Sequence, residues 1–235
     1  ARFNRLNNKT TMFLTGTDEH GLKIEQAAKK NKMDTKKFVD QMNVSFKELT
    51  KTLNLSNDFF VRTTEAYHKK ASQHIWDILK KNNQIYLDKY KGWYSVSDEA
   101  YFNEDEITTD KSGKKLAPTG SEVQWVEEES YFFKLSEWQD KLLDFYDKNP
   151  EFIGPESRKN EVVSFVKNGL NDLSISRTTF SWGVEVPDDK KHVMYVWLDA
   201  LINYLSAIGY PDKKYKKFWP ADLHVVGKDI IRFHA

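Results

Sequence analysis

The hydrophobic and polar positions along the chain divide it into extended and helical segments. Short runs of β-branched and aromatic residues predict strands, and apolar residues spaced three or four positions apart predict amphipathic helices. Strands are predicted at residues 10–16, 58–62, 178–186, 194–197 and 223–226. Helices are predicted at residues 22–32, 35–53, 65–82, 136–148, 157–170 and 199–208.

The second predicted helix has a clear start and a clear apolar stripe. Asp34 stands where an N-cap residue would accept a backbone N–H. Phe38, Met42, Phe46 and Leu49 follow at helical spacing, and we expect them to face the core. From about residue 84 to residue 133 the pattern changes to short extended pieces broken by polar turns. The chain therefore reads as α/β, then a β-rich insertion with helices, then α/β again.

Two segments near the C-terminus read as a strand running directly into a helix, at residues 195–204 and 224–234. In an open parallel sheet such junctions are where ligands bind. The helical spacing puts one set of side chains on one face, and the second junction adds two more: Trp197, Ala200, Leu201 and Tyr204, then Phe233 and His234. An ordinary buried core helix has the same stripe, so the pattern alone leaves pocket and core both open. Nearby Asp199 favours a pocket.

Two polar loops follow predicted strands. In the loop Asp18-Glu19-His20, a carboxylate can hold an ammonium group or a ribose hydroxyl, and the imidazole can donate to an anion. The same residues could simply cap the next helix, and Asp-x-His supplies only two metal ligands. In Gly227-Lys228-Asp229, the glycine admits a ligand to the backbone and the following helix N-terminus favours anions. A tight turn with an N-cap explains that tripeptide equally well.

Composition narrows the class of protein. The chain has 235 residues, a net charge of +1 and no cysteine, which removes disulfides, thiolate zinc sites and a thiol nucleophile. No run of about 18 apolar residues is present, so no membrane span is expected. The insertion combines Trp93, Tyr94 and Trp125 with several lysines, which suits either nucleic acid or a small domain core.

Taken together, these segments resemble the methionyl-tRNA synthetase family, a class I aminoacyl-tRNA synthetase family. The resemblance covers nearly the whole chain, keeps the family's order, and is carried by residues 13–21, 92–102, 126–135, 173–177, 182–183, 196–204 and 227–234. It implies an α/β fold in which a Rossmann-like parallel sheet is interrupted by a β-rich, zinc-free connective-peptide insertion with helices. The implied parts are residues 1–64 and 191–235 for the Rossmann catalytic domain, and 65–190 for the insertion with its flanking helices.

The resemblance also implies roles for residues. Trp197, Ala200, Leu201, Tyr204, Phe233 and His234 match the family's methionine pocket, with Asp18 beside it to meet the α-ammonium group. His20, Gly227, Lys228 and Asp229 match positions near ATP, and Arg177 matches a position linked to amino-acid activation. No zinc is expected, because residues 84–130 offer no thiolate where many relatives carry cysteine knuckles.

The implied reaction uses L-methionine and ATP with Mg²⁺ to make methionyl-adenylate, and then transfers methionine to tRNA(Met). The family's His-Ile-Gly-His and Lys-Met-Ser-Lys-Ser signatures are absent from this sequence, so the isolated chain is expected to be inactive. We expect a monomeric, cytoplasmic enzyme, with an organellar matrix as the other location. The alternatives are a related synthetase for leucine, isoleucine or valine, or a non-catalytic tRNA- or nucleotide-binding module of the same fold.

Overall fold

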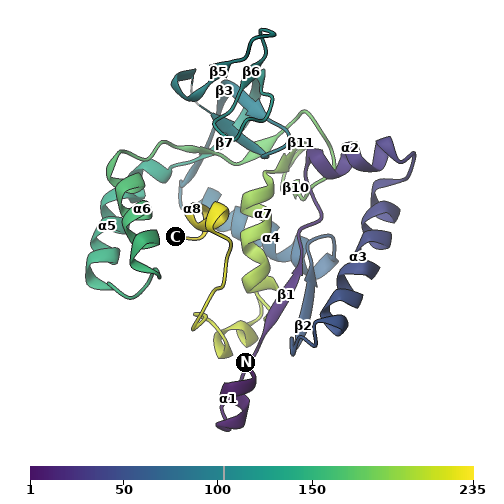
Figure 1. Ribbon diagram of the computed structural model, residues 1–235, viewed down its shortest axis with the longest axis vertical. Coiled ribbons are helices and arrows are strands. Elements are labelled where there is room, and N and C mark those ends of the chain that lie inside the picture. The colour runs from purple at the N-terminus through teal and green to yellow at the C-terminus, as the bar shows by residue number, and fades with distance from the viewer. Residues whose placement is uncertain (103) are drawn as a thin grey trace.

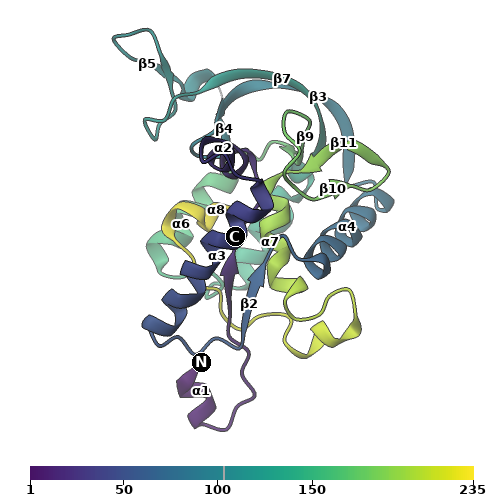
Figure 2. The same ribbon diagram turned by 90° about the vertical axis from the view of Figure 1, so that its right-hand side faces the viewer.

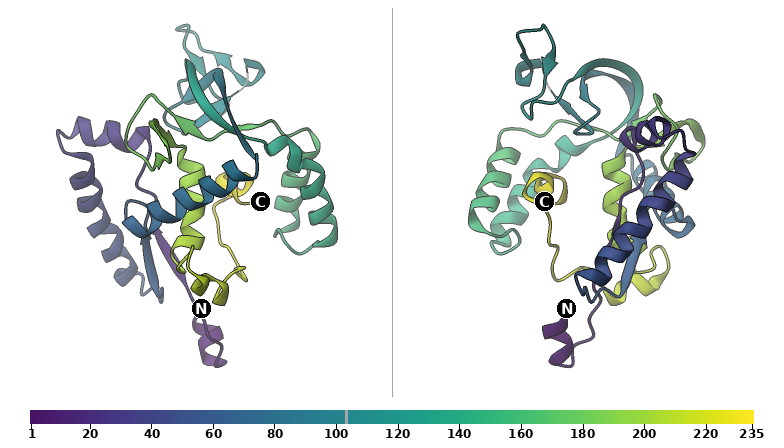
Figure 3. Two further views of the ribbon diagram at one scale, coloured as in Figure 1. Left: turned by 180° about the vertical axis from the view of Figure 1, so that it is seen from behind. Right: turned by 45° about the vertical axis from the view of Figure 1, so that its right-hand side comes forward.

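The computed structural model describes residues 1–102 and 104–235. Helix α7 (Val196–Ser206) runs through the middle of the molecule (Figure 1). Helices α2 (Leu22–Lys30) and α3 (Thr35–Thr52) lie on one side of it, and α5 (Gln139–Lys148) and α6 (Glu156–Lys167) lie on the other. Figure 3 shows the same separation from behind.

The first α/β part contains two parallel strands. Strand β1 (Leu14–Thr17) pairs with β2 (Phe59–Arg62), and α2 and α3 make the connection between them. The short helix α1 (Arg2–Leu6) precedes β1. Asp34 caps α3 as predicted, because its carboxylate accepts the Lys37 N–H at 3.0 Å. Since parallel strands need a long crossover, the two helices are the expected link.

The prediction for the inward face of α3 is wrong. Met42, Phe46 and Leu49 are 45%, 47% and 48% exposed, and the buried residues of the helix are Val39 and Asn43. Asn43 explains the rotation, since its amide donates to Thr17 Oγ1 at 3.0 Å on the edge of β1. A buried polar side chain must find partners, so this hydrogen bond decides which face turns inward.

The insertion is built on a long antiparallel pair. Strand β3 (Ile85–Ser95) pairs with β7 (Gln124–Phe133), and the two bend together over the top of the molecule (Figure 2). Strands β4 (Ala100–Phe102) and β8 (Leu173–Ser174) flank them in the order β4-β3-β7-β8. A 3-10 turn (Glu104–Glu106) leads to a small hairpin of β5 (Thr108–Thr109) and β6 (Lys115–Leu116).

A second antiparallel sheet leads the chain into α7. It consists of β9 (Ser176–Arg177), β10 (Glu185–Val186) and β11 (Asp189–Met194) in the order β10-β11-β9. The strand predicted at residues 178–186 is therefore reduced to its last two residues. The strand predicted at 194–197 is also wrong, because β11 ends at Met194 and α7 begins at Val196. Tyr195 keeps an extended backbone and serves as the N-cap between them.

Two apolar cores hold these parts together. One lies between α4 (Ala66–Lys81), the insertion and the start of α7, and it buries Trp76, Ile85, Ile175, Val184, Val186 and Met194. The other packs α5 and α6 against the C-terminal helix α8 (Ile231–His234), and it buries Tyr146, Val162, Val166, Leu170 and Ile231. A 3-10 turn (Leu135–Trp138) precedes α5, and another (Lys228–Ile230) precedes α8.

The strand predicted at residues 223–226 does not form. This segment follows a 3-10 turn (Lys213–Lys217) and pairs with no strand in the part of the chain that the structure describes. Leu223 and Val225 are 76% and 88% exposed. A run of β-branched residues becomes a strand only where a neighbour supplies hydrogen bonds, and here none does.

The predicted fold class is confirmed as mixed α/β, with parallel strands plus antiparallel sheets in the insertion. The predicted boundaries at residues 64 and 190 stay predictions. In the described residues, no helix combines the length and the apolar character needed to cross a bilayer.

Candidate functional site

Helix α7 has two different faces. Val196, Asp199, Ile202 and Ser206 are buried on one of them. The predicted stripe of Trp197, Ala200, Leu201 and Tyr204 lies on the other face and is only partly buried. A core helix would hide such an apolar stripe completely, so the partial exposure makes this face the wall of a candidate site.

Helix α8 brings a second aromatic wall to α7. The Phe233 ring stacks on the Trp197 ring with centroids 3.8 Å apart and planes 4° apart. Ile231 anchors α8 by packing into the core of α5 and α6. The helices of the two predicted strand–helix junctions are therefore in contact, although the strands predicted at residues 194–197 and 223–226 do not form.

Tyr204 and His234 join the same two helices through a hydrogen bond of 2.7 Å between Tyr204 Oη and His234 Nε2. His234 Nδ1 lies 2.9 Å from the carbonyl of Ile230, which can only accept, so Nδ1 carries the proton. In the neutral ring Nε2 then accepts, and Tyr204 is the donor. Burial raises the pKa of Tyr204, which keeps its hydroxyl protonated for this bond.

Asp18 places a carboxylate on the loop after β1. Burial raises the pKa of Asp18 well above its ordinary value of 3.8, and the carboxylates of Asp199 and Glu99 raise it further. Part of residue 18 stays open to solvent, so a ligand can still reach it, and the negative charges of Asp199 and Glu99 act on it as well. A carboxylate repelled by its neighbours is well suited to an incoming ammonium group.

His20, on the same loop, is buried against α7. His20 Nδ1 donates to Asp199 Oδ2 at 2.6 Å, and His68 Nε2 of α4 donates to Asp199 Oδ1 at 2.6 Å. The exposed fractions of these three side chains do not exceed 3%. Burial acts to raise the pKa of Asp199, but the hydrogen bonds from His20 and His68 outweigh it and the pKa is lowered.

Glu19 was named from the sequence only as a member of this loop, without a site role of its own, yet it organises the loop. It accepts from Arg62 Nε at 2.7 Å, and Thr17, Asn43 and Thr64 donate to it as well. Glu19 is 3% exposed, so its charge needs this surround of donors. No local signal in the sequence indicates these contacts, because they depend on the parallel pairing that sets Thr17 opposite Arg62.

Arg177 is completely enclosed, with 1% of its surface exposed. Its guanidinium lies over the rings of Tyr195 and Tyr101, 4.0 and 4.4 Å from the centroids, and 3.8 Å from Glu128. Tyr195 is the N-cap of α7, so Arg177 contacts the N-terminal end of that helix. Its predicted link to activation stays a prediction.

The residues predicted near ATP fall into two environments. Gly227, Lys228 and Asp229 are exposed at the start of the turn before α8. His20 is buried beside Asp199 instead. Gly227 has an ordinary φ of −65°, so the backbone there does not demand glycine.

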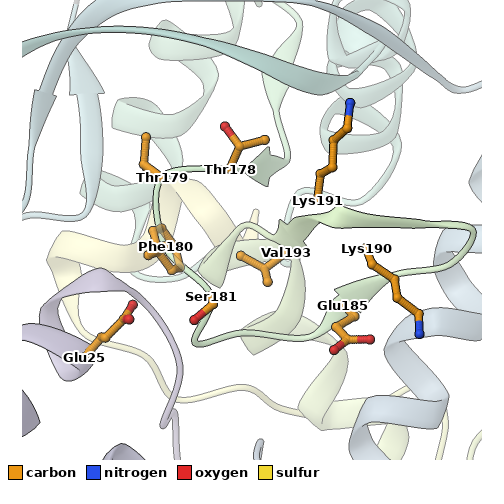
Figure 4. Close-up of a pocket in the computed structure, with 9 residues that line it drawn as sticks. All are labelled: Glu25, Thr178, Thr179, Phe180, Ser181, Glu185, Lys190, Lys191 and Val193. Carbon is orange, nitrogen blue, oxygen red and sulfur yellow. The ribbon is translucent and has the colours of Figure 1, made fainter.

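The surface also carries hollows away from these residues. One of about 410 Å³ lies between α2 and the loop before β10 and is lined by Glu25, Thr178, Thr179, Phe180, Ser181, Glu185, Lys190, Lys191 and Val193 (Figure 4). Another of about 490 Å³ lies beyond the end of α7, beside Met12 and Phe218. None of the predicted site residues lines either hollow. Among the described residues, no group of three or more His, Asp or Glu side chains is placed to hold a metal ion.

Comparison with known proteins assigns the chain to the class I aminoacyl-tRNA synthetases. The whole chain, residues 1–235, matches the family described as "tRNA synthetases class I (M)", and it belongs to that family. It is 61% identical over 237 residues to the methionine–tRNA ligase of Rickettsia bellii and 55% identical to that of Brucella suis biovar 1. Each alignment covers all of this chain and 46% of the relative, so the chain spans about half the length of these relatives.

The fold is also similar to solved structures. The Mycobacterium tuberculosis methionyl-tRNA synthetase bound by methionyl-adenylate has 52% sequence identity and a TM-score of 0.97, over 100% of this chain and 47% of that one. The apo form of the enzyme from the same organism gives a TM-score of 0.79, with 42% identity, over 95% of this chain and 51% of that one. The chain thus superposes more completely on the adenylate-bound structure than on the apo form.

Proposed function

We propose that this chain is the catalytic part of a methionine–tRNA ligase that activates methionine with ATP and transfers it to tRNA(Met). The observation that carries the proposal is the pair of contacts between α7 and α8, in which Trp197 stacks on Phe233 and Tyr204 donates to His234. The similarity to a methionyl-tRNA synthetase bound by methionyl-adenylate supports it.

The aromatic wall suits the side chain of methionine. A thioether is flexible and polarisable, and each sulfur–ring contact contributes ~0.3–1.5 kcal/mol. Ala200 and Leu201 add small apolar surface between the rings of Trp197 and Tyr204 on the same helix face. In this proposal the carboxylate of Asp18 pairs with the α-ammonium group and fixes which end of the amino acid points outward.

In the proposed first step the methionine carboxylate attacks the α-phosphorus of ATP. A bond forms between that oxygen and phosphorus, the bond to the β-phosphate oxygen breaks, and pyrophosphate leaves. Gly227, Lys228 and Asp229 are proposed to lie against the adenosine, with His20 supporting the loop behind it. Mg²⁺ belongs to the proposal as the companion of the ATP phosphates, and no residue of this chain is assigned to it.

In the proposed second step a hydroxyl of the terminal ribose of tRNA(Met) attacks the carbonyl carbon of methionyl-adenylate. An ester bond to the ribose forms, the bond from that carbon to the phosphate oxygen breaks, AMP leaves, and the hydroxyl proton is released to solvent. Positioning and charge stabilisation suffice for both steps, without a covalent enzyme intermediate. Trp125, which is 52% exposed on the insertion sheet, offers one face for nucleic acid. We further propose a monomer that acts in the cytoplasm.

Amino-acid-dependent exchange of pyrophosphate into ATP, measured on the full-length protein, tests the proposal. We expect exchange with methionine at least a hundredfold faster than with leucine, isoleucine or valine. Preference for a branched-chain amino acid would assign the chain to a neighbouring specificity. Methionine binding without any exchange would instead favour a non-catalytic module.

A further inference from the structure

A buried bracket of three side chains joins the elements that build the proposed methionine site. Asp199 lies on the hidden face of α7, His20 on the loop after β1, and His68 on α4. Along the chain, His20 lies 179 residues before Asp199, and His68 lies 131 residues before it. We propose that Asp199 is a positioning residue, which through His20 and His68 sets the placement of α7 that methionine binding requires.

The hydrogen-bond directions inside the bracket are fixed. Ionised Asp199 can only accept, so His20 Nδ1 and His68 Nε2 must both carry protons. His68 Nδ1 then faces the Ser206 hydroxyl at 2.8 Å, and Ser206 lies further along α7, near its C-terminal end. Helix α7 is thus held to α4 at two points, and to the loop after β1 at one.

The bracket connects Asp18 and the aromatic face of α7 through one carboxylate, that of Asp199. The backbone N–H of His20 donates to the Asp18 carboxylate, and the His20 ring donates to Asp199. Trp197 and Tyr204 lie on the same helix as Asp199, on its other face. A change in the His20–Asp199 bond therefore alters the distance between the ammonium-binding carboxylate and the aromatic wall.

Two observations separate this bracket from ordinary packing. It places an ionised carboxylate at 0% exposure, which is costly unless the donors are held in place. His20 Nε2 is also buried and has no hydrogen-bond partner, so the ring keeps its place through the single bond to Asp199 and an edge contact with Trp182. The His20 side chain is thus oriented for Asp199 rather than for water.

The two histidines permit a reciprocal test, because each uses a different ring nitrogen. The amide of Asn reaches about as far as Nδ1, and the amide of Gln reaches about as far as Nε2. His20→Asn and His68→Gln keep a donor facing Asp199, whereas His20→Gln and His68→Asn remove it. In the full-length enzyme we expect the second pair to raise the KM for methionine about ten- to hundredfold, and in His68→Asn we expect the KM for ATP to change less than threefold. The first pair should stay within about threefold of wild type.

His192→Gln is the matched control, since His192 is equally buried but bonds Ser176 and lies near Glu129. We expect it to lower the melting temperature without raising the KM for methionine. Equal effects of Asn and Gln at both histidines, or a rise in KM with His192→Gln, would overturn the bracket.

The inference rests on the proposed function, so one readout is independent of substrate. Hydrogen exchange of residues 196–206 should be faster in His20→Gln and His68→Asn than in wild type, and unchanged in His20→Asn and His68→Gln. If the wild-type enzyme shows no methionine-dependent exchange of pyrophosphate, the proposed function fails while these amides still report whether Asp199 holds α7. Unchanged amide exchange in all four variants would overturn the positioning role even in an active enzyme.

Discussion

At the scale of single residues, the aromatic wall is the part of the site with the most surface to lose. Trp197→Ala and Tyr204→Ala should each weaken methionine binding in the full-length enzyme by about 2–4 kcal/mol, because large aromatic anchors dominate such pockets. Isothermal titration with methionine measures the change. Trp125→Ala is the control, since Trp125 is half exposed on the distant insertion sheet. Unchanged affinity in both wall variants would make the stripe ordinary core.

Because the pKa of Asp18 is raised, we expect the KM for methionine to depend on pH in one defined direction. Its pKa is raised by burial and by Asp199 and Glu99, and only the ionised form can pair with an ammonium group. The KM for methionine should therefore fall as pH rises through this raised pKa, and Asp18→Asn should have a higher KM that no longer changes over that range. A KM profile of Asp18→Asn that follows the wild-type profile would assign the titration to another group.

The same residue has the opposite effect on stability. Since the folded pKa of Asp18 lies above the ordinary 3.8, the unliganded protein loses stability as pH rises from 3.8 through the raised value. Asp18→Asn should not show this loss, and chemical denaturation at two pH values measures the difference.

At the scale of elements, the sequence was most reliable where local chemistry decides the outcome. The Asp34 cap was predictable from residue type, and the face of α7 that carries Trp197 and Tyr204 was predictable from helical spacing. The parallel sheet was implied only by the family resemblance. The rotation of α3 was not, because it depends on Asn43 reaching Thr17 across the fold. The strand predicted at residues 223–226 was also wrong, because a strand needs a neighbouring strand that the local sequence cannot supply.

The same limit applies to the site. Helical spacing predicted that the side chains of the α7 stripe share one face. Nothing in the local sequence indicated that Asp199 would bond His68, or that Glu19 would bond Arg62. Those contacts join residues more than 40 positions apart.

The turn around Asp98 in the insertion is held by oxygen chemistry. Thr119 and Ser121 donate to the Asp98 carboxylate at 2.6 and 3.0 Å, and Ser95 accepts the Asp98 N–H. Asp98→Ala should lower the free energy of unfolding by about 1 kcal/mol.

Treatment with EDTA should leave the melting temperature of wild type unchanged, as the sequence has no cysteine. A metal-dependent melting temperature, or zinc found by elemental analysis, would contradict this prediction.

At the scale of the whole molecule, Arg177 connects the insertion to the N-terminal end of α7. Arg177→Met should lower the free energy of unfolding by about 3–5 kcal/mol, because it leaves Glu128, which is 7% exposed, without its cation. Denaturant titration measures the loss. Arg158→Met is the control, since its pair with Glu161 is partly exposed and contributes less than about 1 kcal/mol. Similar losses in the two variants would show that the enclosed guanidinium has no special structural role.

The chain contains the proposed methionine-binding residues but neither of the two signatures that its family uses for the phosphates, so we expect its activity to depend on the rest of the full-length protein. The isolated 235-residue chain should bind methionine weakly and exchange pyrophosphate at less than about a thousandth of the rate of the full-length protein, because transition-state charge on the phosphates is the largest contribution to such reactions. The control is full-length enzyme with both signatures changed to alanine, which should fall to the same level. Exchange by the isolated chain at the full-length rate would show that residues 1–235 themselves stabilise the phosphates, and Lys228 and Arg232 beside α8 would then be the first cations to mutate.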